Sequence, residues 1–324
     1  MNAALLLASG LALLLVGWAA TGPSVLNRAT AALCRTPRTA VLFLVTSGGL
    51  WFASLVSVAL VLTWSAGGPA LLPGHVAEVC QRCVESASPF GSPSGTLLSP
   101  ALPLLVALLL MATLIARALV RAGLRWRTTA REVADHLAGA ERAELMGHVV
   151  HLLDDDVPRA FCLPTRSGGI AVSRGAIEVL DPQELRAVLA HEAAHLRQRH
   201  HLQVAGLHAL FGPLTWIPLY RAILDAAPLY LELAADDAAR RQCGTDALAS
   251  ALLQMSSTKA HDLAPGVALH AAGPDRVRHL VAPTPARHGL PALGLGVSQL
   301  ALAIAISAGV ILTYVMTFVA GCTI

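Results

Sequence analysis

The chain has 324 residues, of which 55% are hydrophobic and only 13% are charged, and its mean hydropathy is +0.62. Soluble domains usually carry about 25% charged residues, so this composition indicates a protein that lies mostly in or on a membrane. The net charge of +3 is small and only 4% of the residues are aromatic. Direct binding of nucleic acid through a basic or base-stacking surface is therefore not expected.

Four apolar stretches are each long enough for a membrane helix, which needs about 20 residues. These spans are expected at about 2–20, 40–64, 101–120 and 293–319. The first stretch has no Lys or Arg before it, which argues against a cleaved signal peptide. We therefore expect a mainly α-helical, integral membrane protein, built as a multi-span helical bundle. Residues 1–120 form a membrane domain with three spans and an outer loop at about 65–100, and residues 292–324 hold the C-terminal span.

Basic residues decide the expected orientation, because Lys and Arg concentrate on the cytoplasmic side of membrane spans. The loop at 21–39 holds three Arg and no acidic residue, and the segment after residue 120 is rich in Arg. The loop at 65–100 holds one Arg and two Glu. We therefore expect a multi-pass protein of the cell membrane with both termini outside and a cytoplasmic domain at 121–291.

Within 121–291, a helical pattern predicts a helix over Thr128–Leu153. Two short strands are expected at Ala160–Pro164 and Gly169–Val172, joined by a glycine turn. The cytoplasmic domain is therefore expected to carry a small β-sheet beside its helices.

A well-capped helix carries the residues on which the functional prediction depends. Asp181 and Glu184 have the spacing of a capping box, and the helix is expected to run to about His200. His191 and His195 lie four residues apart on it, so their imidazoles share one face, one turn apart. Two histidines in this arrangement can bind one zinc ion.

Glu192, next to the first histidine, is placed to take a proton from a zinc-bound water, which zinc makes more acidic. The product is a nucleophile suited to peptide carbonyls. The motif therefore predicts a zinc metalloendopeptidase with Zn²⁺ as its cofactor and Glu192 as the catalytic general base. An ordinary helix with incidental histidines is the structural alternative, so the rest of the ligand set must decide.

A catalytic zinc site needs a third protein ligand, and there are two candidates. His201 lies ten residues after the first histidine, but Gln198 stands where a glycine turn would be needed to bring it back. Glu232 lies on a second expected helix with Asp236 one turn further on. Glu232 can then bind zinc while Asp236 accepts the free ring N–H of a ligand histidine. We expect Glu232 as the ligand, with a solvated acidic patch as the alternative.

Zinc binding by His191, His195 and Glu232 would constrain the membrane topology, because all three must lie on one side. The apolar segment 202–223 lies between them, so it cannot be a single crossing. Two prolines interrupt it, which fits a membrane-dipping hairpin or a buried or interfacial helix.

Several motifs in order resemble the membrane-embedded gluzincin peptidases. They are AFCLPTRSGGIAVSRGAIEVLDPQELRAVLAHEAAHLRQRH, LTWIPLYRAI and LELAADDAAR. The pattern most resembles the M56 peptidases of the BlaR/MecR type, because Trp216 and Pro218 precede the Glu232 helix. It is also similar to the related M48 peptidases of the HtpX type.

The resemblance implies a gluzincin-type protease domain with zinc on the three ligands named above and Glu192 as general base. It also implies that the strand around Ile170–Ser173 pairs with an extended substrate. The segment GPDRVRHL resembles a later family element, which would place Arg276 near the site or the substrate; a structural role at a helix start is the alternative. The penicillin-binding sensor domain of antibiotic sensors is not expected, because only residues 320–324 follow the last span.

The leading hypothesis is a membrane-bound zinc endopeptidase that cleaves a protein or peptide substrate at the cytoplasmic face of the lipid bilayer. By resemblance, the substrate would be a DNA-binding transcriptional repressor. One alternative is an M48-like quality-control protease for membrane proteins. Another is a catalytically silent receptor or scaffold, against which the retained Glu192 argues. The sequence predicts no particular oligomeric state.

Overall fold

The fold is taken from a computed structural model of the chain. It describes residues 3–65, 106, 109, 110, 112–121, 123, 124, 128, 140–162, 169–257, 276, 279–281 and 285–321. The expected outer loop and much of the expected span at 101–120 lie outside these residues, although positions 112–121 are helical. The described part is mainly α-helical with a small mixed sheet, as the sequence predicts.

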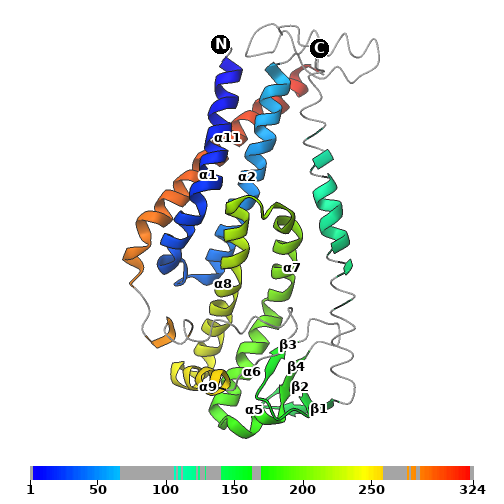
Figure 1. Ribbon diagram of the computed structural model, residues 1–324, viewed down its shortest axis with the longest axis vertical. Coiled ribbons are helices and arrows are strands. Elements are labelled where there is room, and N and C mark those ends of the chain that lie inside the picture. The colour runs from blue at the N-terminus through cyan, green and yellow to red at the C-terminus, as the bar shows by residue number, and fades with distance from the viewer. Residues whose placement is uncertain are drawn as a thin grey trace.

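Three described helices are long and apolar enough to cross a membrane. Helices α1 (Ala3–Leu33) and α2 (Pro37–Ser65) form an antiparallel pair joined by a short turn, and α11 (Leu290–Gly321) packs against both (Figure 1). A short 3-10 turn, η3 (Ala286–His288), precedes α11 and contacts α1. The candidate spans are Ala8–Leu33, Pro37–Leu62 and Leu290–Leu312.

A four-stranded sheet lies at the end of the molecule away from the two termini (Figure 1). Its order is β1-β2-β4-β3, in which β2 and β4 are parallel and the other two pairs are antiparallel. The strands are β1 (Glu141–Leu145), β2 (His148–Leu153), β3 (Ala160–Cys162) and β4 (Ile170–Ser173). The inner face of the sheet packs on helices α5 (Arg174–Val179) and α6 (Pro182–Arg197) through a shared apolar cluster.

The helix expected over Thr128–Leu153 is wrong at residues 141–153, which form the β1–β2 hairpin, although Thr128 itself is helical. Met146 and Gly147 at the turn have φ values of 52° and 80°. Positive φ at both central residues is the backbone of a two-residue hairpin turn. Val150 is fully buried in the sheet, so burial of the strand outweighs the helical spacing of its apolar residues.

The sheet also corrects the expectation that Ile170–Ser173 offers a free edge to a substrate. Strand β4 lies between β2 and β3, and its ladder positions are paired on both sides. The edges of the described sheet are β1 and β3. A substrate that adds to this sheet would therefore have to pair with β3 or β1.

Helix α6 begins as the sequence predicts. The Asp181 carboxylate accepts hydrogen bonds from the N–H groups of Gln183 (2.7 Å) and Glu184 (2.8 Å), and Glu184 accepts one from the Asp181 N–H (2.9 Å). The other oxygen of Glu184 accepts hydrogen bonds from Ser250 and Gln254 on α9 (Thr245–Ser257). Glu184 therefore caps α6 and also joins it to α9.

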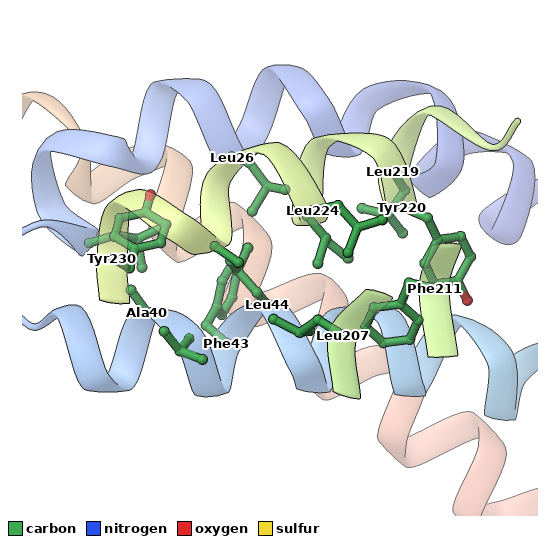
Figure 2. Close-up of a cluster of buried hydrophobic side chains, with 14 of the residues drawn as sticks. Leu26, Ala40, Phe43, Leu44, Leu207, Phe211, Leu219, Tyr220, Leu224 and Tyr230 are labelled. Atoms are coloured by element: carbon green, nitrogen blue, oxygen red, sulfur yellow. The ribbon is translucent and has the colours of Figure 1, made fainter. Parts of the chain in front are cut away.

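The apolar segment at 202–223 turns back on itself. It comprises α7 (His200–Phe211), the 3-10 turn η1 (Gly212–Leu214) and the start of α8 (Pro218–Cys243). Figure 2 shows the hairpin packed against α1 and α2, with Phe211 and Tyr220 near its tip. A Cβ on Gly48 of α2 would lie 2.6 Å from the Phe211 ring, so glycine is needed for this close approach.

The outer side of this hairpin is apolar. Trp216 at the turn is 78% exposed, and Leu202 and Leu210 on α7 are each about half exposed. Exposed large apolar side chains on a protein with membrane-spanning helices favour contact with lipid. The segment at 202–223 is thus a helical hairpin rather than one straight helix, and its place in the membrane stays a prediction.

Candidate metal centre

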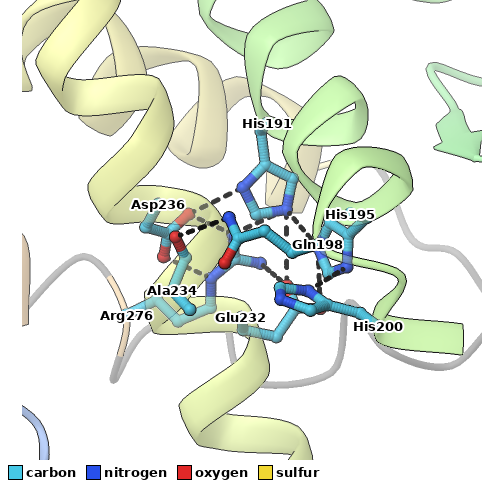
Figure 3. A network of polar contacts seen from close by, with 8 residues as sticks. All are labelled: His191, His195, Gln198, His200, Glu232, Ala234, Asp236 and Arg276. Carbon is cyan, nitrogen blue, oxygen red and sulfur yellow. Dashed lines mark hydrogen bonds and ion pairs between the residues drawn. The ribbon is translucent and has the colours of Figure 1, made fainter. Parts of the chain in front are cut away.

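Two helices that lie side by side bring the predicted site residues together (Figure 3). Helix α6 supplies His191 and His195, and α8 supplies Glu232 and Asp236, each pair one helical turn apart. All four residues are 4% exposed or less. Buried polar groups need partners, so their mutual contacts explain why this part of the fold is stable.

The three expected ligands form a small triangle. The Nε2 atoms of His191 and His195 are 3.0 Å apart, and the Glu232 carboxylate oxygens lie 3.5 Å and 3.4 Å from them. A tetrahedral zinc ion with bonds of about 2.1 Å would separate its ligand atoms by about 3.4 Å. Among the described residues, Glu232 Oε1 accepts no hydrogen bond. The triangle therefore fits a small divalent metal ion.

Asp236 orients the first histidine. Its Oδ1 lies 2.9 Å from Nδ1 of His191, and the Nε2 of the same ring is part of the triangle. A carboxylate behind a ligand histidine fixes the tautomer and makes the ring a stronger ligand. The position of Asp236 one turn after Glu232 is what makes this contact geometrically available.

His200 orients the second histidine, and the sequence did not predict this contact. Nδ1 of His200 lies 3.0 Å from Nδ1 of His195, and His200 is 1% exposed. Burial lowers the pKa of His200 to about 4, so a neutral His200 can accept a hydrogen bond from His195. Nε2 of His195 then faces the triangle.

The contact depends on a break in the chain. Helix α6 ends at Arg197 instead of continuing to His200, and Arg199 has a left-handed backbone with φ 53°. This turn starts α7 in a new direction and brings His200 beside His195. His201, the other candidate for third ligand, does not belong to the metal-binding cluster found among the described residues.

Arg276 compensates the buried carboxylates. Its Nη1 lies 2.8 Å from Glu232, and its Nη2 and Nε lie 2.6 Å and 2.9 Å from the two oxygens of Asp236. The guanidinium is 1% exposed. The structure thus places Arg276 within the polar network of the centre, in contact with both carboxylates.

The charges around the triangle favour a cation there. Burial alone would neutralise these groups, but the His191 hydrogen bond and the Arg276 charge lower the pKa of Glu232 to about 2. Hydrogen bonds to Asp236 and Glu232 likewise outweigh burial and raise the pKa of His191 to about 9. The two ionised carboxylates therefore favour positive charge at the histidines. A proton can supply this charge, and so can a metal ion.

Glu192 and strand β3 border the centre. Glu192 lies on α6 and is 3% exposed. Burial, and the negative charge of Glu192, raise the pKa of the Cys162 thiol on β3. Strand β3 also contacts α6, the helix that carries the predicted general base.

The fold and this centre define a membrane-associated helical protein with a buried His-His-Glu cluster that could hold one metal ion. The sequence profile of Peptidase family M48 matches residues 125–227. No solved structure matches the chain. The M48 match covers α6 and α7 and the start of α8, and it ends before Glu232.

Curated relatives support the same assignment. "Protease HtpX homolog" of Aquifex aeolicus is 40% identical over 62 residues, which are 18% of this chain and 20% of that protein. Homologs with the same name from Thermoplasma acidophilum (42% over 52 residues; 15% and 16%) and Methylibium petroleiphilum (39% over 62 residues; 18% and 22%) are also similar. The chain matches about a fifth of the length of these relatives. Together the matches support an M48-type membrane metallopeptidase, and the M56 assignment is not confirmed.

Arg276→Met should strongly destabilise the metal-free protein, because it leaves two buried carboxylates without their cation. Removing one partner of a buried ion pair typically costs about 3–5 kcal/mol. Arg240→Met is the matched control, since Arg240 pairs with Asp237 at the surface (3.1 Å) and such pairs contribute about 0–1 kcal/mol. Thermal unfolding in detergent with a chelator measures both, and equal losses of stability would contradict the role of Arg276.

His200→Leu should weaken metal binding by about 10–100-fold, because His195 loses the partner that orients its ring. His201→Leu, one residue further along α7, is the matched control and should bind metal as the wild type does. Competition with a fluorescent zinc chelator gives the two affinities. An unchanged affinity in His200→Leu would show that its contact with His195 does not position a ligand.

Proposed function

We propose that the protein is a membrane-bound zinc endopeptidase of the M48 type. The observation that carries this proposal is the triangle of His191, His195 and Glu232, with Glu192 on the same helix as the two histidines. In this proposal the three side chains bind Zn²⁺, and the M48 match over the histidine helix supports the assignment.

The proposed chemistry divides between the metal and the protein. His191, His195 and Glu232 would hold the zinc ion, which would supply Lewis-acid chemistry at the scissile carbonyl and make a bound water more acidic. Glu192 would take a proton from the attacking water and would then give a proton to the nitrogen of the leaving amine. The C–N bond breaks, and the water oxygen remains in the new carboxyl group.

The surrounding residues keep the site ready for this reaction. Asp236 and His200 hold the two histidine rings in place, and Arg276 balances the charge of the carboxylates. Strand β3 is the edge of the described sheet that lies near Glu192, so an extended peptide could add to it as a further strand. This replaces β4, which has no free edge.

The substrate is proposed to be a membrane or membrane-proximal protein cleaved at the cytoplasmic face. Both termini are proposed to lie outside, following the distribution of Arg. The similarity to HtpX homologs favours the M48-type quality-control alternative, and the comparisons give no support to a repressor as substrate. A silent scaffold is disfavoured because a three-ligand centre and Glu192 are both kept.

Glu232→Ala should remove most of the bound zinc, since two histidines alone hold the ion weakly. The purified wild-type protein should contain about one zinc per chain. Elemental analysis of the two proteins in the same detergent gives the stoichiometry, with His201→Leu as a variant that should keep its zinc. A full complement of zinc in Glu232→Ala, with loss in His201→Leu, would make His201 the third ligand.

Glu192→Gln should keep the zinc and lose proteolysis, because the amide cannot accept the proton of the attacking water. Removal of such a base typically costs about 10²–10⁴-fold in rate. Cleavage of a protein substrate such as casein by wild type and variant provides the measurement. Activity near the wild-type level would refute the general-base role.

The same variant separates the two proposed substrate classes. In cells that carry only Glu192→Gln, a quality-control role predicts that many membrane proteins accumulate. Accumulation of a single DNA-binding protein in the cytosolic proteome would instead favour the repressor hypothesis. Chromosomal wild type, expressed at the same level, is the control for both comparisons.

A further inference from the structure

A cavity of about 220 Å³ lies at the turn between α1 and α2, apart from the metal-ligand triangle. The turn and the first residues of α2 form one wall, with Arg35 and Arg38. Helix α8 forms the other wall with Ala234, Asp237 and Arg241. None of these residues has a role in the proposed proteolysis.

The charges of the cavity favour an anion. Three arginines line it, against one acidic residue, and Asp237 is already paired with Arg240 at 3.1 Å. In the described part of the chain, neither Arg35 nor Arg241 forms an ion pair. The first turn of the 29-residue helix α2 also lines the cavity, and the positive end of its dipole adds to the attraction.

The cavity lies between the ends of two candidate membrane spans. One candidate span ends at Leu33 and the next begins at Pro37, so a bilayer crossed by both helices would have its headgroups at the level of the turn with Arg35. Phosphate esters of lipids are the most concentrated anions at this level, and each nearby arginine strengthens binding of anionic lipid by about 1 kcal/mol. Guanidinium groups also match the geometry of phosphate oxygens.

We propose that this cavity binds a phosphate ester, and that its source is the headgroup of an anionic phospholipid. Arg35, Arg38 and Arg241 surround the phosphate, and the acyl chains lie along the apolar surface of α1 and α2. The site adjoins the metal centre: Arg38 donates to Gln198 at the end of α6 (3.1 Å), and Gln198 donates to the carbonyl of Ala234 on α8 (3.4 Å). The bound headgroup would thus fix the position of α6 and α8 relative to the membrane surface.

The test is a lipid titration of the full chain in detergent, followed by native mass spectrometry. The probe is phosphatidylglycerol, with zwitterionic phosphatidylcholine in a parallel series. The double variant Arg35→Gln/Arg241→Gln should bind phosphatidylglycerol about 25-fold more weakly, at about fivefold per arginine. Its affinity for phosphatidylcholine should match that of the wild type.

The matched control is Arg28→Gln/Arg287→Gln, which removes the same charge from exposed arginines near the same surface but outside the cavity lining. Its phosphatidylglycerol affinity should stay within about twofold, and all three proteins should unfold at the same temperature. Equal losses of phosphatidylglycerol affinity in both double variants would show an effect of surface charge alone and would overturn the proposal. Wild-type affinity in Arg35→Gln/Arg241→Gln would overturn it as well.

A third series adds inorganic phosphate to the complex with phosphatidylglycerol. Lipid binding that persists at equal phosphate concentration supports the headgroup as the source. Displacement of the lipid would overturn that source and identify the cavity as a site for soluble phosphate.

Discussion

The burial of two carboxylates on one face of α8 is the constraint that the rest of the centre satisfies. Glu232 and Asp236 are each 1% exposed, and an uncompensated charge at this depth would destabilise the fold by several kcal/mol. Arg276 contacts both groups, and His191 contacts each from the other side. The cluster therefore assembles only when α6, α8 and Arg276 are all in place, which couples the fold to the site.

The same constraint links the site to the membrane bundle. Helix α8 carries the carboxylates in its C-terminal half, and its N-terminal half packs through Leu219, Tyr220 and Ile223 against α1 and α2. The Tyr220 hydroxyl donates to the carbonyl of Gly48 on α2 at 3.0 Å. The single helix α8 thus belongs both to the core shared with α1 and α2 and to the cluster around Glu232. Because packed interiors are rigid, a shift of α1 and α2 would also displace Glu232.

Features with local causes could be predicted from the sequence. The capping box at Asp181 and the four-residue spacing of His191 and His195 follow from helix geometry alone. The pairing of Glu232 with Asp236 follows from the same spacing. The requirement that three ligands meet also predicted that the segment at 202–223 turns back, which hydropathy by itself would have missed.

Features that depend on tertiary contacts could not be predicted. The strands at 141–153 have apolar residues at helical spacing, and only pairing with β4 selects the extended form. The central position of β4 requires knowledge of the strand order. Arg199 has a left-handed backbone although it is not a glycine, so the sequence carries no signal for the end of α6. The sequence therefore predicted that the helix continues to His200.

The family match and the ligand geometry are independent arguments for the same centre. The M48 profile ends at residue 227, before the helix turn that holds Glu232, so similarity alone leaves the third ligand unassigned. The geometry supports the proposal of Glu232 without reference to any family, because Glu232 Oε1 and Oε2 lie 3.4–3.5 Å from the two histidine nitrogens. His201 is adjacent to the orienting His200, yet it does not join the triangle among the described residues. The packing of α6 against α8 thus supports the proposal of a carboxylate as third ligand, which would distinguish a gluzincin-type centre from one completed by a third histidine.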